Sequence, residues 1–249
     1  MINLKSKREI EVMRDASCIV AEVLEELRIR CKPGVLTGDL DRFAEEKTRK
    51  HGGVPAFKGY RGFPGALCAS INQQVVHGIP GNCELKEGDI VGLDFGVYYK
   101  GYFGDSAITV PIGAISTETE ALLKTTRECL DLGIEQMVPE NHLSDLSRAI
   151  QVHAETNGYS LVKEFGGHGI GKNLHEDPMV LNYVVNGRGI KLKPGLVLAV
   201  EPMVNMGASQ VKILEDGWTV VTADGKPSAH FEHTVAVTQN GPEILTKLS

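Results

Sequence analysis

The chain has 249 residues, 42% of them hydrophobic, and a net charge of −6 from 26 basic and 32 acidic side chains. This composition is that of an ordinary folded protein and excludes a disordered, collagen-like or coiled-coil chain. A nucleic-acid-binding protein usually carries a basic excess, and no apolar run approaches the roughly 18 residues that span a bilayer. We therefore expect neither a membrane nor a specific nucleic acid as a partner.

The cysteines and the N-terminus both favour a reducing compartment. Five cysteines are scattered along the chain with no Cys-x-x-Cys pair, so a structural zinc site and a disulfide framework are not expected. No apolar segment follows the first charged residues, which argues against a secretory signal. We expect a cytoplasmic protein, and the absence of a low-complexity linker favours a single domain over residues 1–249.

Two helices are predicted at the start of the chain. Ser6 and Glu9 form a capping-box pattern, and the apolar residues that share one helical face behind it are Ile10, Met13, Val20, Leu24 and Leu27. Lys32-Pro33-Gly34 ends this helix, whereas a second helix opens at Thr37 and ends at Gly52-Gly53. A glycine-rich stretch that is poor in strands follows over residues 55–67.

Strands are expected over residues 68–110, and two more helices follow them. Thr117 and Glu120 form a second capping-box pattern, which predicts a helix to about residue 137. A fourth helix is expected over residues 144–156, with Asn157-Gly158 as its C-cap. The remainder of the chain is predicted to be strand and turn.

An internal repeat indicates two related halves. The motif Leu-Lys-x-Gly-x-x-apolar-x-x-acid ends at Asp94 in the first half and, 107 positions later, at Glu201 in the second. Asp105 and Glu232 also share an acid-x-x-apolar-x-Val pattern. Chance is the alternative, because Leu-Lys-x-Gly is a common lead-in to a strand. The repeat favours helix–helix–strand halves near residues 1–115 and 116–249, with equivalent acids meeting near an approximate two-fold axis.

The acids of the repeat suit a metal centre. Side chains alternate across a strand, so Asp94 points away from Leu93 and Phe95, and a hairpin turn at residues 101–104 would return Asp105 toward Asp94. A carboxylate in an apolar run such as the one before Glu201 is costly unless it is paired or binds a metal. Each residue alone has an ordinary explanation: a turn or capping Asp, a salt-bridged Glu, a core His. Together, four carboxylates and one imidazole suit two divalent ions.

The segment Phe165-x-Gly167-His168-Gly169-Ile170-Gly171-x-x-x-His175 resembles the signature of type I methionine aminopeptidases. Further motifs follow in the family's order over essentially the whole chain: Ser70-Ile71-Asn72, Val76-His77-Gly78-Ile79-Pro80, Gly101-x-x-Gly104-Asp105, Glu201-Pro202-Met203 and Phe231-Glu232-His233-Thr234. Several spaced motifs in order are more specific than any one of them.

This resemblance implies an α+β pita-bread fold: two pseudo-symmetric helix–helix–strand halves around a central antiparallel sheet. It implies removal of the initiator methionine from nascent polypeptides when the second residue is small. The metal-ligand positions carry Asp94, Asp105, His168, Glu201 and Glu232. The resemblance makes His77, His175 and Glu201 catalytic, and it places His77, His175, Phe57, Tyr60, Phe63, Cys68 and Trp218 against the substrate.

The same resemblance implies two divalent ions per chain, drawn from cobalt, manganese, iron(II) and zinc. It places Asn72 and Ser228 in a region that holds a monovalent cation in relatives. Ribosome association and a monomeric state are further expectations. Two positions depart from relatives: Leu174 stands where an aromatic is common, and Phe57 stands where some bacterial relatives carry Cys.

Three other interpretations remain open at this point. A proline-specific peptidase of the same fold usually carries an additional N-terminal domain. A non-catalytic binding relative typically loses metal ligands, whereas all five ligand types are present here. A metal-free structural protein would have to tolerate clustered, unpaired carboxylates.

Overall fold

The structure is a computed structural model that describes residues 2–248. Its α-helices over this range are α1 (Lys7–Arg30), α2 (Thr37–Lys50), α3 (Thr117–Glu135) and α4 (Leu143–Thr156), with a short 3₁₀ turn at Tyr60–Gly62. The strands of the first half are β1 (Val54–Pro55), β2 (Cys68–Ile71), β3 (Gln74–Val76), β4 (Ile90–Tyr99) and β5 (Tyr102–Pro111). Those of the second half are β6 (Ser160–Leu161), β7 (Gly167–Gly169), β8 (Glu176–Val180), β9 (Val197–Val200), β10 (Met203–Asn205), β11 (Val211–Ile213), β12 (Val220–Thr222), β13 (Ser228–His230), β14 (Glu232–Thr238) and β15 (Gly241–Ile244).

A nine-stranded antiparallel sheet within the described residues joins the two halves. Its order is β1-β4-β5-β14-β9-β7-β8, with β2 also paired to β4 and β15 to β14. The halves meet where β5 pairs with β14. Two three-stranded sheets, β13-β10-β6 and β11-β12-β3, lie beside it.

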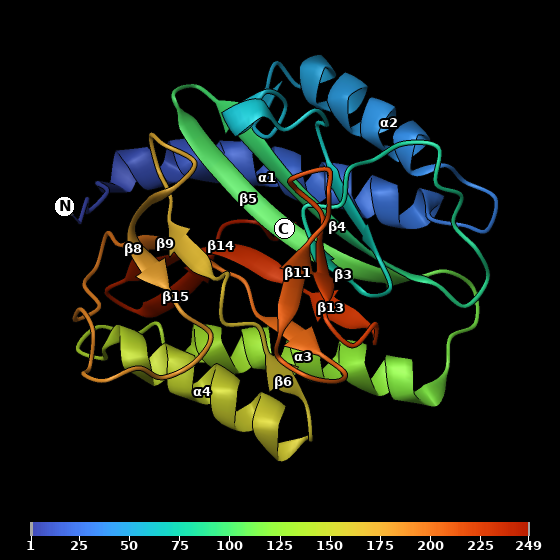
Figure 1. Ribbon diagram of the computed structural model, residues 1–249. Helices are drawn as coiled ribbons and strands as arrows, with labels where there is room; N and C mark the ends of the chain where they lie inside the picture. The colour runs from blue at the N-terminus through green and yellow to red at the C-terminus, as the bar shows by residue number, and fades with distance from the viewer. Residues whose placement is uncertain (1, 249) are drawn as a thin grey trace.

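The helices pack as two pairs, one for each half. Helix α1 packs on β4, β5 and α2, whereas α3 packs on α4 and on strands β9, β13 and β14. Figure 1 shows the pair α1 and α2 along one side of the long strands and the pair α3 and α4 along the other. Each half also has its own hydrophobic core, one around Phe95 and Leu27, the other around Leu146 and Leu198. The predicted helix–helix–strand repeat is therefore confirmed.

The helix ends agree with the sequence at α1 and differ at α3. The Glu9 amide donates to Ser6 Oγ at 3.3 Å, and the Ser6 amide donates to Glu9 Oε2 at 2.8 Å, which completes the predicted capping box. The predicted box at Thr117 is wrong: Ser116 Oγ accepts from the Thr119 amide at 3.2 Å. The cap lies one residue earlier because the Ser116 hydroxyl caps the helix without a Glu or Gln three residues later, and α3 ends at residue 135 instead of 137.

One expectation about the strands also needs correction. The turn between β4 and β5 is formed by Lys100 and Gly101, both at positive φ (48° and 91°), since Tyr99 already pairs with Tyr102. Two consecutive left-handed residues are the geometry that matches the twist of a tight hairpin. The predicted turn over residues 101–104 is therefore wrong, although Asp105 does return toward Asp94. Glu232 begins β14, which is followed by one more strand, β15.

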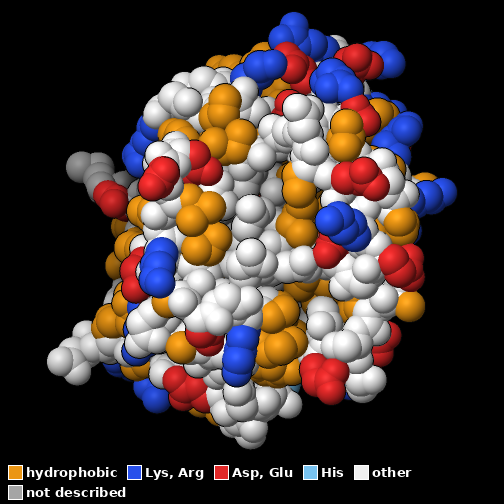
Figure 2. All heavy atoms as spheres, turned by 45° about the vertical axis from the view of Figure 1, so that its right-hand side comes forward, with side chains coloured by type: hydrophobic (Ala, Val, Ile, Leu, Met, Phe, Trp, Pro, Cys, Tyr) orange, Lys and Arg blue, Asp and Glu red, His pale blue; other side chains and the backbone are white. Residues whose placement is uncertain are grey.

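The surface gives no sign of a membrane-spanning segment. None of the helices within residues 2–248 is both long and apolar enough to cross a bilayer. Figure 2 shows acidic and basic side chains interspersed over one face of the molecule, with hydrophobic side chains between them. This mixed charge accords with the modest net charge of the sequence.

The contact between α1 and β5 depends on a glycine. A Cβ atom at Gly104 would lie 2.8 Å from Ser17 Oγ and 2.9 Å from the Ser17 backbone nitrogen. We predict that Gly104→Ala lowers the free energy of unfolding by about 1–3 kcal/mol, because helix and strand must move apart. Urea denaturation measures this change. Gly81→Ala is the control, since a Cβ at Gly81 meets nothing within 4 Å; equal stability losses in both variants would contradict the packing argument.

Candidate metal centre

One cavity brings together every residue that the sequence predicted to bind metal, to catalyse the reaction or to contact the substrate. Its volume is about 140 Å³. The predicted residues that line it are Phe57, Tyr60, Phe63, Cys68, His77, Asp94, Asp105, His168, His175, Glu201, Trp218 and Glu232. Leu174 and Arg61 also line it. Acids and aromatic rings thus line the same cavity.

Strand register explains why the four acids share one face. On β4 and β5, Asp94 pairs with Ala107 and Gly96 pairs with Asp105, so the two aspartates are diagonal neighbours on the same face. Glu232 pairs with the other side of Ala107. The register of β14 with β9 then places Glu201, directly after β9, across from Glu232. Four carboxylates from four segments therefore converge without any long loop.

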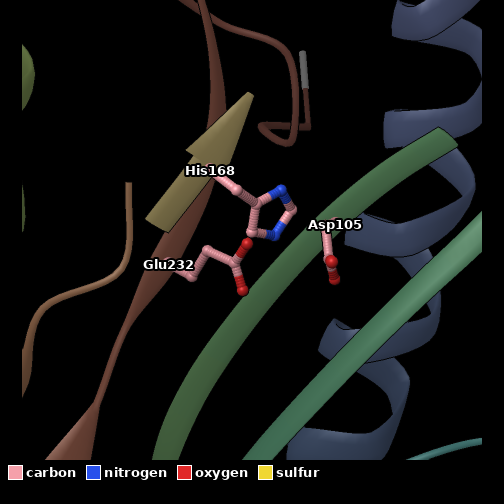
Figure 3. A group of neighbouring side chains, drawn as sticks. All are labelled: Asp105, His168 and Glu232. Carbon is pink, nitrogen blue, oxygen red and sulfur yellow. The ribbon is translucent and has the colours of Figure 1, made fainter. Parts of the chain in front are cut away.

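His168 reaches this cluster from β7, where two glycines permit close backbone packing. A Cβ at Gly167 would lie 2.2 Å from the carbonyl oxygen of Ala199, and one at Gly169 would lie 2.2 Å from that of Asp177. Ligand atoms of His168, Asp105 and Glu232 all lie within 4.8 Å of one another. Figure 3 shows the three side chains pointing toward one another from three different strands.

The donor set fits divalent cations. Asp94 Oδ1, Asp105 Oδ1 and Glu232 Oε1 are buried and have no hydrogen-bond partner among the described residues. Buried polar oxygens are almost always paired, so three such oxygens in one cavity point to a missing cationic partner. Carboxylate oxygens with one imidazole nitrogen match ions such as manganese, iron(II), cobalt and zinc.

The pKa values of the four acids also indicate a site for cations. Burial raises the pKa of Asp94 to about 7. Burial, together with the charge of Asp94, also raises the pKa values of Asp105 and Glu201 well above their usual range. The pKa of Glu232 rises through burial and the charges of Asp105, Glu201 and Asp94. These carboxylates therefore resist ionising together unless a cation offsets their repulsion.

Glu201 lies between two buried histidines. His168 Nε2 is 3.6 Å from Glu201 Oε1, and His230 Nε2 is 3.7 Å from Glu201 Oε2. Burial lowers the pKa of His168 to about 4 and that of His230 to about 3. Both imidazoles are therefore neutral near pH 7, and the nitrogen of His168 is free to bind a metal ion. Asn182 Nδ2 donates to the Glu201 carbonyl at 3.0 Å and holds the backbone there.

The remaining histidines lie among the aromatic rings. The Tyr60 hydroxyl is 2.9 Å from His175 Nδ1, and the two rings stack with centroids 5.3 Å apart. His77 meets the rings of Phe165 and Trp218 edge to face. Burial lowers the pKa of His77 to about 4, and burial with the charge of Arg61 lowers that of His175. Both rings are neutral hydrogen-bonding groups near pH 7.

A side chain outside the cavity holds its single tryptophan in place. Asp216 Oδ1 accepts from the amides of Trp218 and Thr219, each at 2.8 Å. The Trp218 ring packs edge to face on Phe63 with centroids 5.2 Å apart. These contacts give the apolar part of the cavity a fixed wall.

The structure also brings together Asn72 and Ser228. The Ser228 amide donates to the Asn72 carbonyl at 3.0 Å. The Asn72 side chain accepts from the Ile90 amide and donates to Asp89. The two residues are therefore neighbours, and their role toward a monovalent cation stays a prediction.

Two residues of this region were missed by the sequence analysis. Arg61 lines the cavity, and its signal was the surrounding Gly59-x-x-Gly62, which permits an unusual turn. His230 lies against Glu201 from β13, two residues before the predicted ligand Glu232. Its proximity depends on the pairing of β13 with β10, which no local motif reveals.

Comparison with known proteins places this geometry in a family. The sequence profile of metallopeptidase family M24 matches residues 11–239. The chain is 54% identical over 246 residues to a methionine aminopeptidase of Clostridium perfringens, with 99% of each chain covered. It is 50% identical to methionine aminopeptidase 1 of Bacillus subtilis, with both chains fully covered.

Solved structures give the same result for the fold. The chain superimposes on a methionine aminopeptidase from Thermotoga maritima with a TM-score of 0.98 and 44% identity, covering both chains completely. A prolidase from Pyrococcus furiosus shares the fold with a TM-score of 0.81, at 22% identity and over 66% of its own chain. The expected pita-bread architecture is confirmed, and the chain is a hydrolase of metallopeptidase family M24 that belongs to the methionine aminopeptidases.

Proposed function

We propose that this enzyme removes the N-terminal methionine from nascent polypeptides whose second residue is small, with the help of two divalent ions. The single observation that carries the proposal is the convergence of four carboxylates and His168 in one cavity beside an aromatic pocket. We also propose that residues 1–249 form one catalytic domain, because strands of both halves pair in one sheet.

The metal ligands in this proposal are Asp94, Asp105, His168, Glu201 and Glu232. Cobalt, manganese, iron(II) and zinc all suit such a donor set. Divalent ions held by these residues would supply Lewis acidity, which would polarise a peptide carbonyl and make water more acidic. Ligand atoms of three of the five side chains, Asp105, His168 and Glu232, lie within 4.8 Å of one another.

Glu201 is our choice for proton transfer. Its carboxylate lies inside the cavity between His168 and His230, and burial raises its pKa. A carboxylate whose pKa is raised is a stronger base toward water than an ordinary one, and once protonated it can donate that proton to the leaving amine.

His175 and His77 handle the substrate's peptide bond. If the Tyr60 hydroxyl donates to His175 Nδ1, the neutral ring carries its proton on Nε2. That N–H can donate to a carbonyl oxygen that gains charge during hydrolysis. His77, held between Phe165 and Trp218, orients the scissile amide or assists its departure.

The apolar part of the cavity accounts for the choice of methionine. Phe57, Tyr60, Phe63, Cys68 and Trp218 surround a space that suits an unbranched, polarizable thioether. The cavity is about 140 Å³ in volume, so a large second side chain would compete for room with the first. Leu174 and Phe57 keep this wall apolar at the two positions where relatives differ.

We further propose that the enzyme works as a cytoplasmic monomer on chains emerging from the ribosome, with a monovalent cation near Asn72 and Ser228. All five cysteines lie within the described residues and are free thiols, which suits a reducing compartment. The proposed substrates are the N-termini of nascent chains. Such chains are made on ribosomes, which is why we propose the cytoplasm and the ribosome.

A proline-specific peptidase is the second function that the fold accommodates. The prolidase likeness is at 22% identity and shows the fold alone. We predict hydrolysis of Met-Ala-Ser, little hydrolysis of Met-Leu-Ser and none of Ala-Pro-Ser. Chelation should abolish the activity, and add-back of manganese, iron(II) or cobalt should restore it. Preferential cleavage of Ala-Pro-Ser would replace the proposed substrate, and full activity in excess chelator would remove the metals from the mechanism.

Two histidine variants separate metal binding from catalysis. His168→Ala should lose metal and activity together, because the imidazole is the only nitrogen ligand in the proposed set. His77→Ala should keep its metal content and lose turnover by about a hundredfold or more. Metal analysis of dialysed protein and steady-state kinetics measure both. His51→Ala, at a surface ion pair with Glu22, is the matched control; an unchanged rate in His77→Ala would remove His77 from the mechanism.

The raised carboxyl pKa values predict a pH-dependent stabilisation by metal. The pKa of Asp94 is about 7 in the folded chain and 3.8 ordinarily, so the metal-free protein loses stability as pH rises between those values. Manganese replaces the proton, and the rise in Tm on its addition should therefore be larger at about pH 8 than at about pH 5. Thermal denaturation with and without manganese tests this. An equal rise at both pH values would contradict it, and Asp94→Asn should weaken the pH dependence.

A further inference from the structure

Arg61 occupies an unusual backbone position at the cavity. Its φ is 49°, in the left-handed region that residues other than glycine rarely adopt, and it lies between Gly59 (φ 82°) and Gly62 (φ 93°). Hydrogen bonds fix this turn: the Gly59 amide donates to the Phe63 carbonyl at 2.8 Å, and the Phe63 amide donates to the Tyr60 carbonyl at 3.0 Å. A strained residue in a well-held turn is a reason to look for a role of its side chain.

The guanidinium of Arg61 is a free positive charge at this place. It lies over the ring of Tyr60, 5.3 Å from the centroid, and forms no ion pair with any carboxylate of residues 2–248. Lys58, three residues earlier, is by contrast tied to Glu45 at 2.6 Å. Arg61 itself lines the cavity, so its charge lies at the cavity wall. The other charged groups lining the cavity are the carboxylates of four of the five proposed metal ligands.

The residues that line the cavity differ in their exposure to solvent. Phe63 and Cys68 are 2% and 3% exposed and line its buried interior, here called the closed end, whereas Arg61 is an exposed lining residue on the side toward solvent, here called the mouth. A peptide whose first side chain fills the closed end must leave through the mouth from its third residue onward. The exposed guanidinium therefore lies beside the part of the substrate that the metal site and the pocket do not contact.

We propose that Arg61 selects substrates by the charge that follows the second residue, favouring an acidic third residue and disfavouring a basic one. This inference rests on the proposed function, since it assumes that the methionine side chain enters the closed end. The interaction partner is the side-chain carboxylate of the substrate. An exposed ion pair gives a modest effect, but exchanging an attractive for a repulsive charge doubles it.

The test compares amidated peptides Met-Ala-Xaa-Ser in which Xaa is Asp, Asn or Lys. Amidation removes the terminal carboxylate, which would otherwise compete for Arg61. For the wild-type holoenzyme we expect kcat/KM to fall in the order Asp, Asn, Lys, with about a threefold to tenfold ratio of Asp to Lys at low ionic strength. The ratio should shrink in about 0.5 M NaCl, because salt screens exposed charges.

Substitutions at the same site decide whether Arg61 causes the order. Arg61→Gln should bring the Asp-to-Lys ratio close to one, Arg61→Glu should reverse it, and Arg61→Lys should preserve its direction. Lys58→Gln is the matched control, since it removes a neighbouring cation outside the cavity and should leave the ratio unchanged. An unchanged ratio in Arg61→Gln and Arg61→Glu, with the Asn peptide still cleaved, would overturn the proposal. Failure of the wild-type enzyme to cleave any of the three peptides would instead overturn the proposed function.

Discussion

Electrostatic repulsion between four carboxylates in one small cavity is the constraint on which this structure depends. Transfer of a carboxylate from water into a protein interior costs several kcal/mol per ion unless a partner compensates it. Here burial raises all four pKa values, and the charges of neighbouring acids add to the rise at Asp105, Glu201 and Glu232. Three of the oxygens have no partner among the described residues. Two divalent cations would neutralise the four charges and satisfy those oxygens at the same time.

The fold holds the acids together by strand register. Asp94, Asp105 and Glu232 occupy paired or diagonal positions around Ala107, so that a slip of one residue would turn a carboxylate into the hydrophobic core on the other face. Each half is stabilised by its own helix pair and core. The metal ligands therefore come from both halves, and the site forms where β5 meets β14. This arrangement links the stability of the sheet to the geometry of the cavity.

Much of this site could be predicted because its residues repeat in the sequence. The spacing shared by Asp94 and Glu201 indicated two equivalent strands, and the alternation of side chains along β4 placed Asp94 on the open face. The motif around His168 then indicated the resemblance to type I methionine aminopeptidases. Two kinds of feature could not be predicted from the sequence: contacts between distant segments, and helix caps where neighbouring residues are both suitable. His230 reaches Glu201 only through the pairing of β13 with β10, and Ser116 and Thr117 are equally good caps by composition.

The most direct measurement of the central claim is anomalous diffraction from crystals soaked in manganese, recorded at the manganese absorption edge. The account predicts two strong peaks inside the cavity, within ligand distance of the four carboxylates and of His168 Nε2. Peaks confined to the protein surface, with the cavity carboxylates lacking any metal, would contradict it.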